Sequence, residues 1–245
     1  MIIDTHAHVN FNAYKDDSEE VIRRSLAENI WMINVGSQYT TSKRAVEIAG
    51  KYKEGVYAAV GLHPIHVGEE FEYQKYKELA NSAVAVGEIG LDYKAEYLPF
   101  KEKQKEVLLR QVELAREVNL PVIFHCRLAH NDLIRTLEQS NIRTGVIHCF
   151  TGTWGEAQRY IDMGLYLGFN GIIFKMNLDE VIAKAPLDKI LLETDCPYLT
   201  PPSVFGRNEP IYTKYIAEKI AKVKNLSYEE IIDATTQNAR KLFKI

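Results

Sequence analysis

Residues able to bind a metal end several apolar stretches of this sequence. The first stretch, Ile2-Ile3-Asp4-Thr5-His6-Ala7-His8-Val9, holds two histidines one residue apart. Alternate side chains of a β-strand share a face, so both imidazoles would point the same way. Neutral imidazoles on one face can hold a divalent metal, whereas the simpler alternative is a pair of polar residues at a strand end. Further ligands elsewhere would decide between the two.

Four later apolar runs also lead into a ligand-type residue. They are followed by Glu88 after residues 84–87, His125 after 121–124, His148 after 145–147 and Asp195 after 190–194. A buried polar group without a partner costs about 1–3 kcal/mol, so a set of such groups is expected to share a common binding partner. The sequence therefore predicts a metal site built from strand ends.

Strands and helices that could position these residues alternate along the chain. The predicted strands lie at 2–8, 31–36, 56–62, 83–89, 121–126, 145–149, 165–170 and 190–195. Helical spacing is clear at 100–118 and 129–140, a helix is expected near 210–223, and Ser227 and Glu230 form a capping-box pattern before the last helix. Eight units of about 31 residues match an α/β fold, a single (β/α)8 TIM-type barrel. In a barrel the carboxyl ends of the strands meet at one mouth, whereas an open sheet would spread them along a line.

Composition fits one domain over residues 1–245, because 46% of its residues are hydrophobic. No basic segment followed by an apolar one opens the chain, and no apolar run approaches the roughly 18 residues of a membrane span, so we expect a cytoplasmic protein without membrane contact. The three cysteines do not suggest a disulfide framework. If strand alternation persists, Cys126, Cys149 and Cys196 face outward, toward the helical layer.

The motifs around these residues extend over most of the chain. They are residues 2–10, Gly61-Leu62-His63-Pro64, Gly87-Glu88-Ile89-Gly90-Leu91-Asp92, residues 121–132 around His125-Cys126-Arg127, His148-Cys149-Phe150-Thr151-Gly152, Leu192-Glu193-Thr194-Asp195-Cys196-Pro197 and Arg207-Asn208-Glu209-Pro210. In these motifs the chain resembles the TatD-related deoxyribonucleases, a family of amidohydrolase-like metal-dependent barrels. The resemblance implies a metal-dependent nuclease or phosphodiesterase that often removes nucleotides from DNA ends. The departures from the family pattern, such as Cys196 and Thr151 where Ser is common, concern substrate preference more than metal binding.

Two metal positions that share one carboxylate would account for the predicted ligands. The assignment is His6, His8 and Asp195 to one metal, His125 and His148 to the other, and Glu88 to both. Two divalent ions about 3.5–4 Å apart can stabilise the attacking and leaving oxygens of phosphoryl transfer. Asp195 would also accept or orient the proton of the attacking water, a role that rests partly on the resemblance. Mg, Mn or Zn could occupy the site, and the family's nuclease activity favours Mg or Mn.

Two residues are candidates to bind a substrate phosphate. Arg127 lies two positions after His125, and its guanidinium could bind two phosphate oxygens. His63 is the second candidate. The alternatives are that Arg127 pairs with a structural carboxylate and that His63 donates to a backbone carbonyl.

Other polar residues near the strand ends receive supporting roles. Alternation places Asp4 beneath His6 and Glu193 beneath Asp195, where both could orient ligand imidazoles. Tyr93 or Tyr198 could stack on a base. Asp92 is assigned to loop organisation, outside the site.

The net charge limits the kind of nucleic acid that could bind. With 33 acidic and 30 basic residues, the chain has no basic surface for gripping a long duplex. The resemblance implies a deoxyribonuclease, and this charge balance suits one that acts exonucleolytically on DNA ends or single strands. We expect a monomer or small homo-oligomer. The alternatives are a metallohydrolase of small phosphoesters, lactones or amides, and a non-catalytic metal-binding protein.

Overall fold

Eight parallel strands, hydrogen-bonded in sequence order, form the centre of the molecule. The computed structural model describes all residues from Met1 to Ile245. The strands are β1 (Ile2–Ala7), β2 (Ile30–Val35), β3 (Val56–Val60), β4 (Ala85–Asp92), β5 (Val122–Arg127), β6 (Gly145–Ile147), β7 (Tyr166–Phe169) and β8 (Ile190–Leu192). Beyond β8 the chain returns to β1, where Ala7 and Cys196 form a parallel bridge and the Asp195 amide donates to the His6 carbonyl at 2.9 Å. The sheet is thus a nearly closed barrel, which confirms the predicted fold class.

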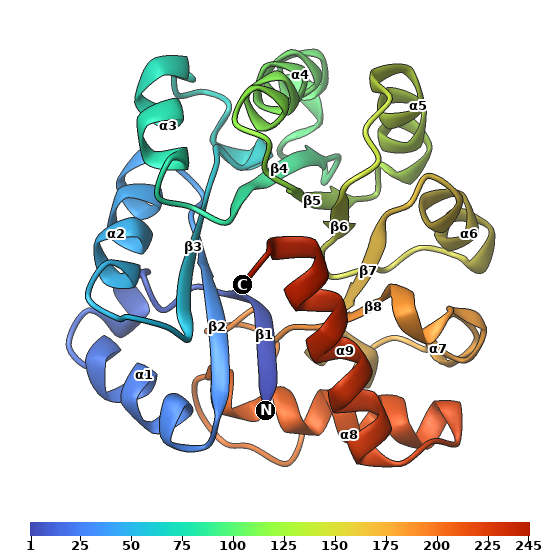
Figure 1. Cartoon of the computed structure of the whole chain (residues 1–245). Helices are drawn as coiled ribbons and strands as arrows, with labels where there is room; N and C mark the ends of the chain where they lie inside the picture. Colours follow the sequence, from blue (N-terminus) through green and yellow to red (C-terminus); the bar gives the residue numbers. More distant parts are fainter.

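Helices surround the barrel, as Figure 1 shows. They are α1 (Ser18–Ala27), α2 (Tyr39–Ala49), α3 (Tyr73–Ala80), α4 (Lys101–Glu117), α5 (His130–Ser140), α6 (Trp154–Asp162), α7 (Asp179–Lys184), α8 (Thr213–Lys224) and α9 (Tyr228–Phe243). The last helix lies across one end of the barrel, where Ala239, Leu242 and Phe243 pack in a cluster with inward-facing strand residues such as Ile3 and Leu191. It therefore covers the amino-terminal ends of the strands, and the carboxyl ends are left for the site.

The predicted helices are confirmed with small shifts at their ends. The pattern at 100–118 corresponds to α4, that at 129–140 to α5, and that at 210–223 to a 3-10 turn followed by α8. At the start of α9 the Ser227 hydroxyl accepts from the Glu230 amide while the Glu230 carboxylate accepts from the Ser227 amide. This reciprocal pair is the capping box expected from the sequence.

The strand ends differ from expectation where the site residues lie. Strand β4 continues to Asp92, with an irregular register between Val86 and Ile89, and β8 stops at Leu192. Local backbone geometry, which side-chain periodicity does not report, sets these ends. Strict alternation therefore does not hold for the residues that follow β6 and β8.

The three cysteines have different surroundings. All are free thiols; Cys126 is buried beside His130 and Tyr160, and Cys196 lies in the apolar cluster under α1. Cys126 and Cys149 both line the cavity at the carboxyl ends of the strands, but the Cys126 thiol contacts His130 and Tyr160, whereas the Cys149 thiol lies 3.5 Å from Asn170 Oδ1 after β7, so the predicted outward orientation of Cys149 is wrong. The reason is that β6 ends at Ile147 and Cys149 takes a left-handed backbone conformation (φ 46°).

A salt-bridged carboxylate joins two helices near the open end of the barrel. Asp132 on α5 accepts from the Tyr93 hydroxyl at 2.9 Å and lies 2.8 Å from Lys101 and 3.2 Å from Lys105 on α4. The hydrogen bond from Lys101 is the largest influence and holds the pKa of Asp132 well below its usual range. Tyr93 is therefore occupied in helix packing and does not line the cavity, contrary to its suggested stacking role.

None of the helices has the combination of length and apolar character that crossing a bilayer requires.

Candidate metal centre

The two histidines of β1 meet a buried carboxylate at the carboxyl end of the barrel. The Nε2 atoms of His6 and His8 are 3.1 Å apart, and Glu88 Oε2 lies 3.4 Å from His6 Nε2. The other ring nitrogen of His8, Nδ1, is 2.8 Å from the Val35 carbonyl. Because a carbonyl only accepts, Nδ1 carries a proton and a neutral His8 presents a lone pair on Nε2.

His148 is held in the same way, by a carboxylate beneath the site. Its Nδ1 donates to Glu193 Oε2 at 2.8 Å, and the Cys149 amide donates to the same oxygen at 3.0 Å. Glu193 is fully buried, and it fits only because residue 168 is Gly: a Cβ there would lie 1.9 Å from Glu193 Oε1. Glu193 thus orients the ring of His148, a proposed metal ligand, as the sequence suggested for a ligand imidazole. It does so from the segment after β8, which ends at Leu192, and not from a strand.

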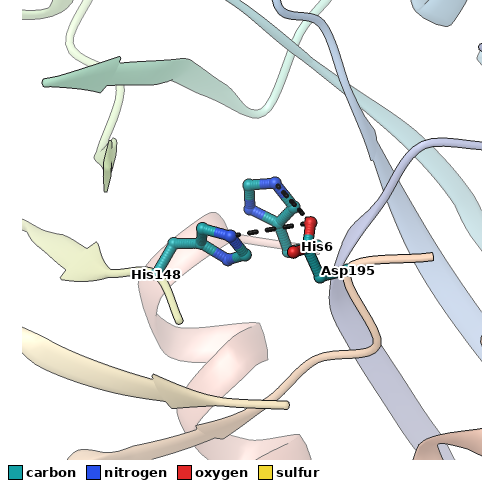
Figure 2. Close-up of side chains that lie close together, drawn as sticks. All are labelled: His6, His148 and Asp195. Atoms are coloured by element: carbon teal, nitrogen blue, oxygen red, sulfur yellow. Dashed lines mark ion pairs between the residues drawn. The ribbon is translucent and has the colours of Figure 1, made fainter. Parts of the chain in front are cut away.

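Figure 2 shows His148 alongside His6, with the Asp195 carboxylate beside them and joined by a dashed line to each ring. The rings stack with centroids 3.4 Å apart, and Asp195 Oδ1 lies 3.7 Å from His148 Nε2, 4.0 Å from His6 Nε2 and 3.3 Å from His8 Nε2. His148 Nε2 is also 3.9 Å from Glu88 Oε1. His148 therefore lies between the two expected metal positions, nearer to the His6 group than the sequence suggested.

His125 on β5 contacts two carboxylates, one of which sequence reasoning left outside the site. Its Nδ1 is 2.7 Å from Glu88 Oε1, and its Nε2 is 3.1 Å from Asp92 Oδ2. Burial alone would lower the pKa of His125, but these carboxylates, Asp92 first, raise it to about 9. The extension of β4 brings Asp92 here, so a prediction that ended this strand at residue 89 missed it.

His63 approaches Glu88 from the loop after β3. Its Nδ1 accepts a hydrogen bond from the Ile65 amide at 3.2 Å, so the proton of the neutral ring lies on Nε2, 3.3 Å from Glu88 Oε1. Burial lowers the pKa of His63 to about 4, which keeps the ring neutral at pH 7. In this tautomer His63 donates a hydrogen bond and has no lone pair for a metal.

Burial and mutual contact shift the other ionisable groups strongly. Burial lowers the pKa of His6 to about 4. For His148, the carboxylates of Glu193 and Asp195 outweigh burial and raise the pKa to about 10. Burial would raise the pKa of Glu88, but the imidazoles of His63 and His6 hold it well below its usual range. Both Glu88 and Asp195 are therefore anions, surrounded by ring nitrogens.

The donor set fits divalent metal ions. Two groups have one ligand atom from each residue within 4.8 Å of the others: His6, His8 and Glu88; and His6, His148 and Asp195. Glu88 and His125 lie equally close together in a third group, whose other member, His63, donates a hydrogen bond toward Glu88. Lone pairs of neutral imidazoles and carboxylate oxygens repel one another at such distances unless a cation or a proton lies between them. Imidazole and carboxylate together suit Zn, Mn, Fe and similar ions.

A clamp on the segment after β8 fixes Asp195, which has a left-handed backbone (φ 57°). The buried Asn208 side chain donates to the Thr194 carbonyl at 3.0 Å and to the Tyr198 carbonyl at 2.6 Å. The Asp4 carboxylate accepts from Thr194 and from the backbone amide of His6. Asp4 thus joins β1 to this segment and does not bond to the His6 ring, contrary to the sequence expectation.

The metal centre lies in a cavity of about 910 Å³. Arg127 lines this cavity with an exposed side chain, and its guanidinium forms no ion pair, so it is not committed to a structural carboxylate. Tyr198 also lines the cavity. The site thus combines metal ligands with one free cation and space for a ligand.

A barrel with metal ligands at the carboxyl ends of its strands is characteristic of metal-dependent hydrolases. The family model of TatD-related DNases matches residues 3–244. The chain therefore belongs to the TatD-related DNase family, a family of metal-dependent hydrolases.

Similar proteins agree over the full length of the chain. The uncharacterized metal-dependent hydrolase YabD of Bacillus subtilis (strain 168) is 42% identical, with 100% of both chains covered. The 3'-5' ssDNA/RNA exonuclease TatD of Edwardsiella piscicida is 32% identical, again over 100% of both chains. The crystal structure of YjjV, a TatD homologue from Escherichia coli K12, is 31% identical and superposes with a TM-score of 0.93, covering 100% of this chain and 98% of that one.

Proposed function

We propose that this protein is a metal-dependent exonuclease that hydrolyses phosphodiester bonds at the end of single-stranded DNA. The observation that carries the proposal is the convergence of His6, His8, His125, His148 and Asp195 around Glu88, beside an unpaired Arg127 in an open cavity. A relative 32% identical over its whole length is named a 3'-5' ssDNA/RNA exonuclease, which supports this substrate class and the 3'-5' direction.

The residues would hold two metal ions with Glu88 between them. His6, His8 and Asp195 would bind one ion, His125 would bind the other, and His148 lies within reach of both positions. Bound divalent ions would acidify the attacking water and stabilise the charge that develops on the phosphate oxygens. The remaining chemistry falls to side chains of this chain.

Asp195 would accept the proton of the attacking water, because it is an anion at neutral pH and lines the cavity. Glu193 keeps the Nδ1 proton of His148 in place, which leaves Nε2 free to bind. His63 would donate a hydrogen bond from Nε2 to Glu88 or to a phosphate oxygen, and Arg127 would bind phosphate oxygens through its guanidinium.

A time course of cleavage tests the proposal. Single-stranded oligonucleotides labelled at either end would be incubated with the Mn-loaded or Mg-loaded protein, with a chelator control and the Asp195→Asn variant. The proposal predicts a ladder that shortens from the 3' end and is absent from both controls. Intact oligonucleotides after incubation with protein of verified metal content would contradict it and favour a small phosphoester, lactone or amide substrate.

A further inference from the structure

Apolar side chains from five different loops form a rim around the metal centre. The rim consists of Phe11 after β1, Ile65 after β3, Leu128 after β5, Met176 after β7 and Tyr198 after β8. Four of them expose large fractions of their surface to solvent: 37% for Ile65, 74% for Leu128, 42% for Met176 and 55% for Tyr198. Large apolar side chains gathered at one mouth, and left uncovered, mark a ligand surface more often than chance exposure does.

The backbone at this mouth is held in an unfavourable conformation. Nine residues other than glycine have positive φ, and four of them, Leu128, Cys149, Asp195 and Leu199, line the cavity. The other five are four asparagines, which adopt this conformation at little energetic cost, and Lys244, which ends α9. Leu128 has this conformation (φ 55°) although its side chain is 74% exposed and gains little packing in return.

The charges around the cavity limit how a nucleic acid could be held. Among the lining residues, Arg127 is the only lysine or arginine, against the three carboxylates of Glu88, Asp92 and Asp195. A protein that follows a nucleic-acid backbone needs a row of cations, one for each phosphate it grips. Apart from the metal centre, the cavity therefore has one cation, Arg127, and can bind about one phosphate.

We propose that the rim binds the bases of the terminal one or two nucleotides of a single strand, while the metal centre and Arg127 hold one phosphate. The inference rests on the proposed function, since it identifies the occupant of the same site. Tyr198 supplies a face for stacking, Leu128 and Met176 supply apolar contact, and a 910 Å³ cavity lies in the range that encloses ligands of this size. Recognition then depends on bases at the strand end and hardly on the length of the strand.

Binding of a hydrolysis-resistant probe tests the inference separately from catalysis. The probes are a fluorescent phosphorothioate pentathymidylate and an abasic pentamer of the same charge, titrated with the Mn-loaded wild-type protein and read by fluorescence anisotropy. The expected result is at least fivefold tighter binding of the pentathymidylate, because stacking contributes about that factor or more per base. Lengthening the thymidylate probe to 20 nucleotides should change its affinity less than threefold.

Three variants assign the effect to the rim. Tyr198→Ala and Leu128→Asn should each reduce the preference for the probe with bases, and Asn tolerates the left-handed backbone at position 128. Phe205→Ala is the matched control, because Phe205 is 99% exposed on the same loop as Tyr198 yet lies outside the cavity. Thermal unfolding of each variant checks that the barrel is intact.

The outcomes distinguish this inference from the proposed function. Base-dependent binding without cleavage of ordinary DNA would support the rim and overturn the nuclease. Cleavage of DNA together with equal affinity for both probes, or a preference that survives both rim substitutions, would overturn the rim alone. No binding and no cleavage would overturn both. A slope of log affinity against log salt steeper than about −3 would indicate several gripped phosphates and would also contradict the inference.

Discussion

Replacing Glu193 by Gln should weaken metal binding about tenfold without unfolding the barrel. The two side chains have the same shape, so the tight fit against Gly168 is preserved. The Gln oxygen can still accept from His148 and from the Cys149 amide, and its NH₂ group takes the place of Glu193 Oε1, which has no partner. The substitution thus removes a charge and leaves the packing nearly unchanged.

The magnitude follows from the lost charge. A hydrogen bond to a charged group contributes about 1.5–3 kcal/mol and a neutral one about 0.5–1.5 kcal/mol, so the bond to His148 weakens by about 1.5 kcal/mol. That difference is about tenfold in affinity and agrees with the 10–100-fold effect of removing a partner of a metal-binding histidine. Proton binding to His148 weakens as well, but a divalent ion loses more because it carries twice the charge.

The assay is competition for Mn between the protein and a chelating dye, with stability measured by urea unfolding. The matched control is Glu230→Gln on α9, which removes the same charge at the covered end of the barrel, where Gln can still serve in the capping box. An unchanged Mn affinity in Glu193→Gln, beside an unchanged control, would refute the claim that Glu193 tunes a metal ligand through His148.

Three further substitutions test other parts of the account. Gly168→Ala should displace Glu193 from His148 and reduce the cleavage rate at least tenfold, because the new methyl group would overlap the Glu193 carboxylate. An active Gly168→Ala enzyme would show that the position of Glu193 is not required for cleavage. Asp132→Asn should destabilise the protein by about 1–2 kcal/mol at pH 7 in urea unfolding. The pKa of Asp132 is lower in the folded than in the unfolded state, so its contribution to stability is complete above the unfolded pKa of about 4 and is lost as the pH falls through the folded pKa. The stability difference between Asp132→Asn and wild type should therefore shrink below pH 4. A difference that stays constant with pH would contradict this assignment. Asn208→Ala should leave two carbonyls beside Asp195 unpaired, costing about 1–3 kcal/mol of stability, and should lower kcat more than it raises KM; a stable variant with normal kcat would remove Asn208 from the positioning of Asp195.

The barrel and the gathering of ligand-type residues could be predicted because both depend on short-range patterns. Apolar runs mark buried parallel strands, and each predicted ligand stands where such a run ends. Once a barrel is assumed, the strand ends must meet at one mouth, so His6 and His148 become neighbours although 142 residues separate them in sequence.

The details that were missed depend on backbone geometry that periodicity does not reveal. Asp92 reaches His125 only because β4 continues past an irregular register and through Gly90, which has φ 154°. Cys149 turns into the cavity because its backbone is left-handed. The orientation of His63 depends on a hydrogen bond from the amide two residues later, a contact formed only when the loop folds. Side-chain type indicates which residues can do chemistry, whereas loop conformation decides which of them face one another.

Metal add-back to stripped protein tests the central claim most directly. The rate of single-strand cleavage would be followed as Mn is restored to chelator-treated wild-type protein and to Glu88→Gln. The account predicts no activity without metal, recovery that saturates at two ions per chain, and little recovery in the variant, because Glu88 lies between both proposed positions. Full activity in stripped protein, or normal recovery in Glu88→Gln, would contradict it.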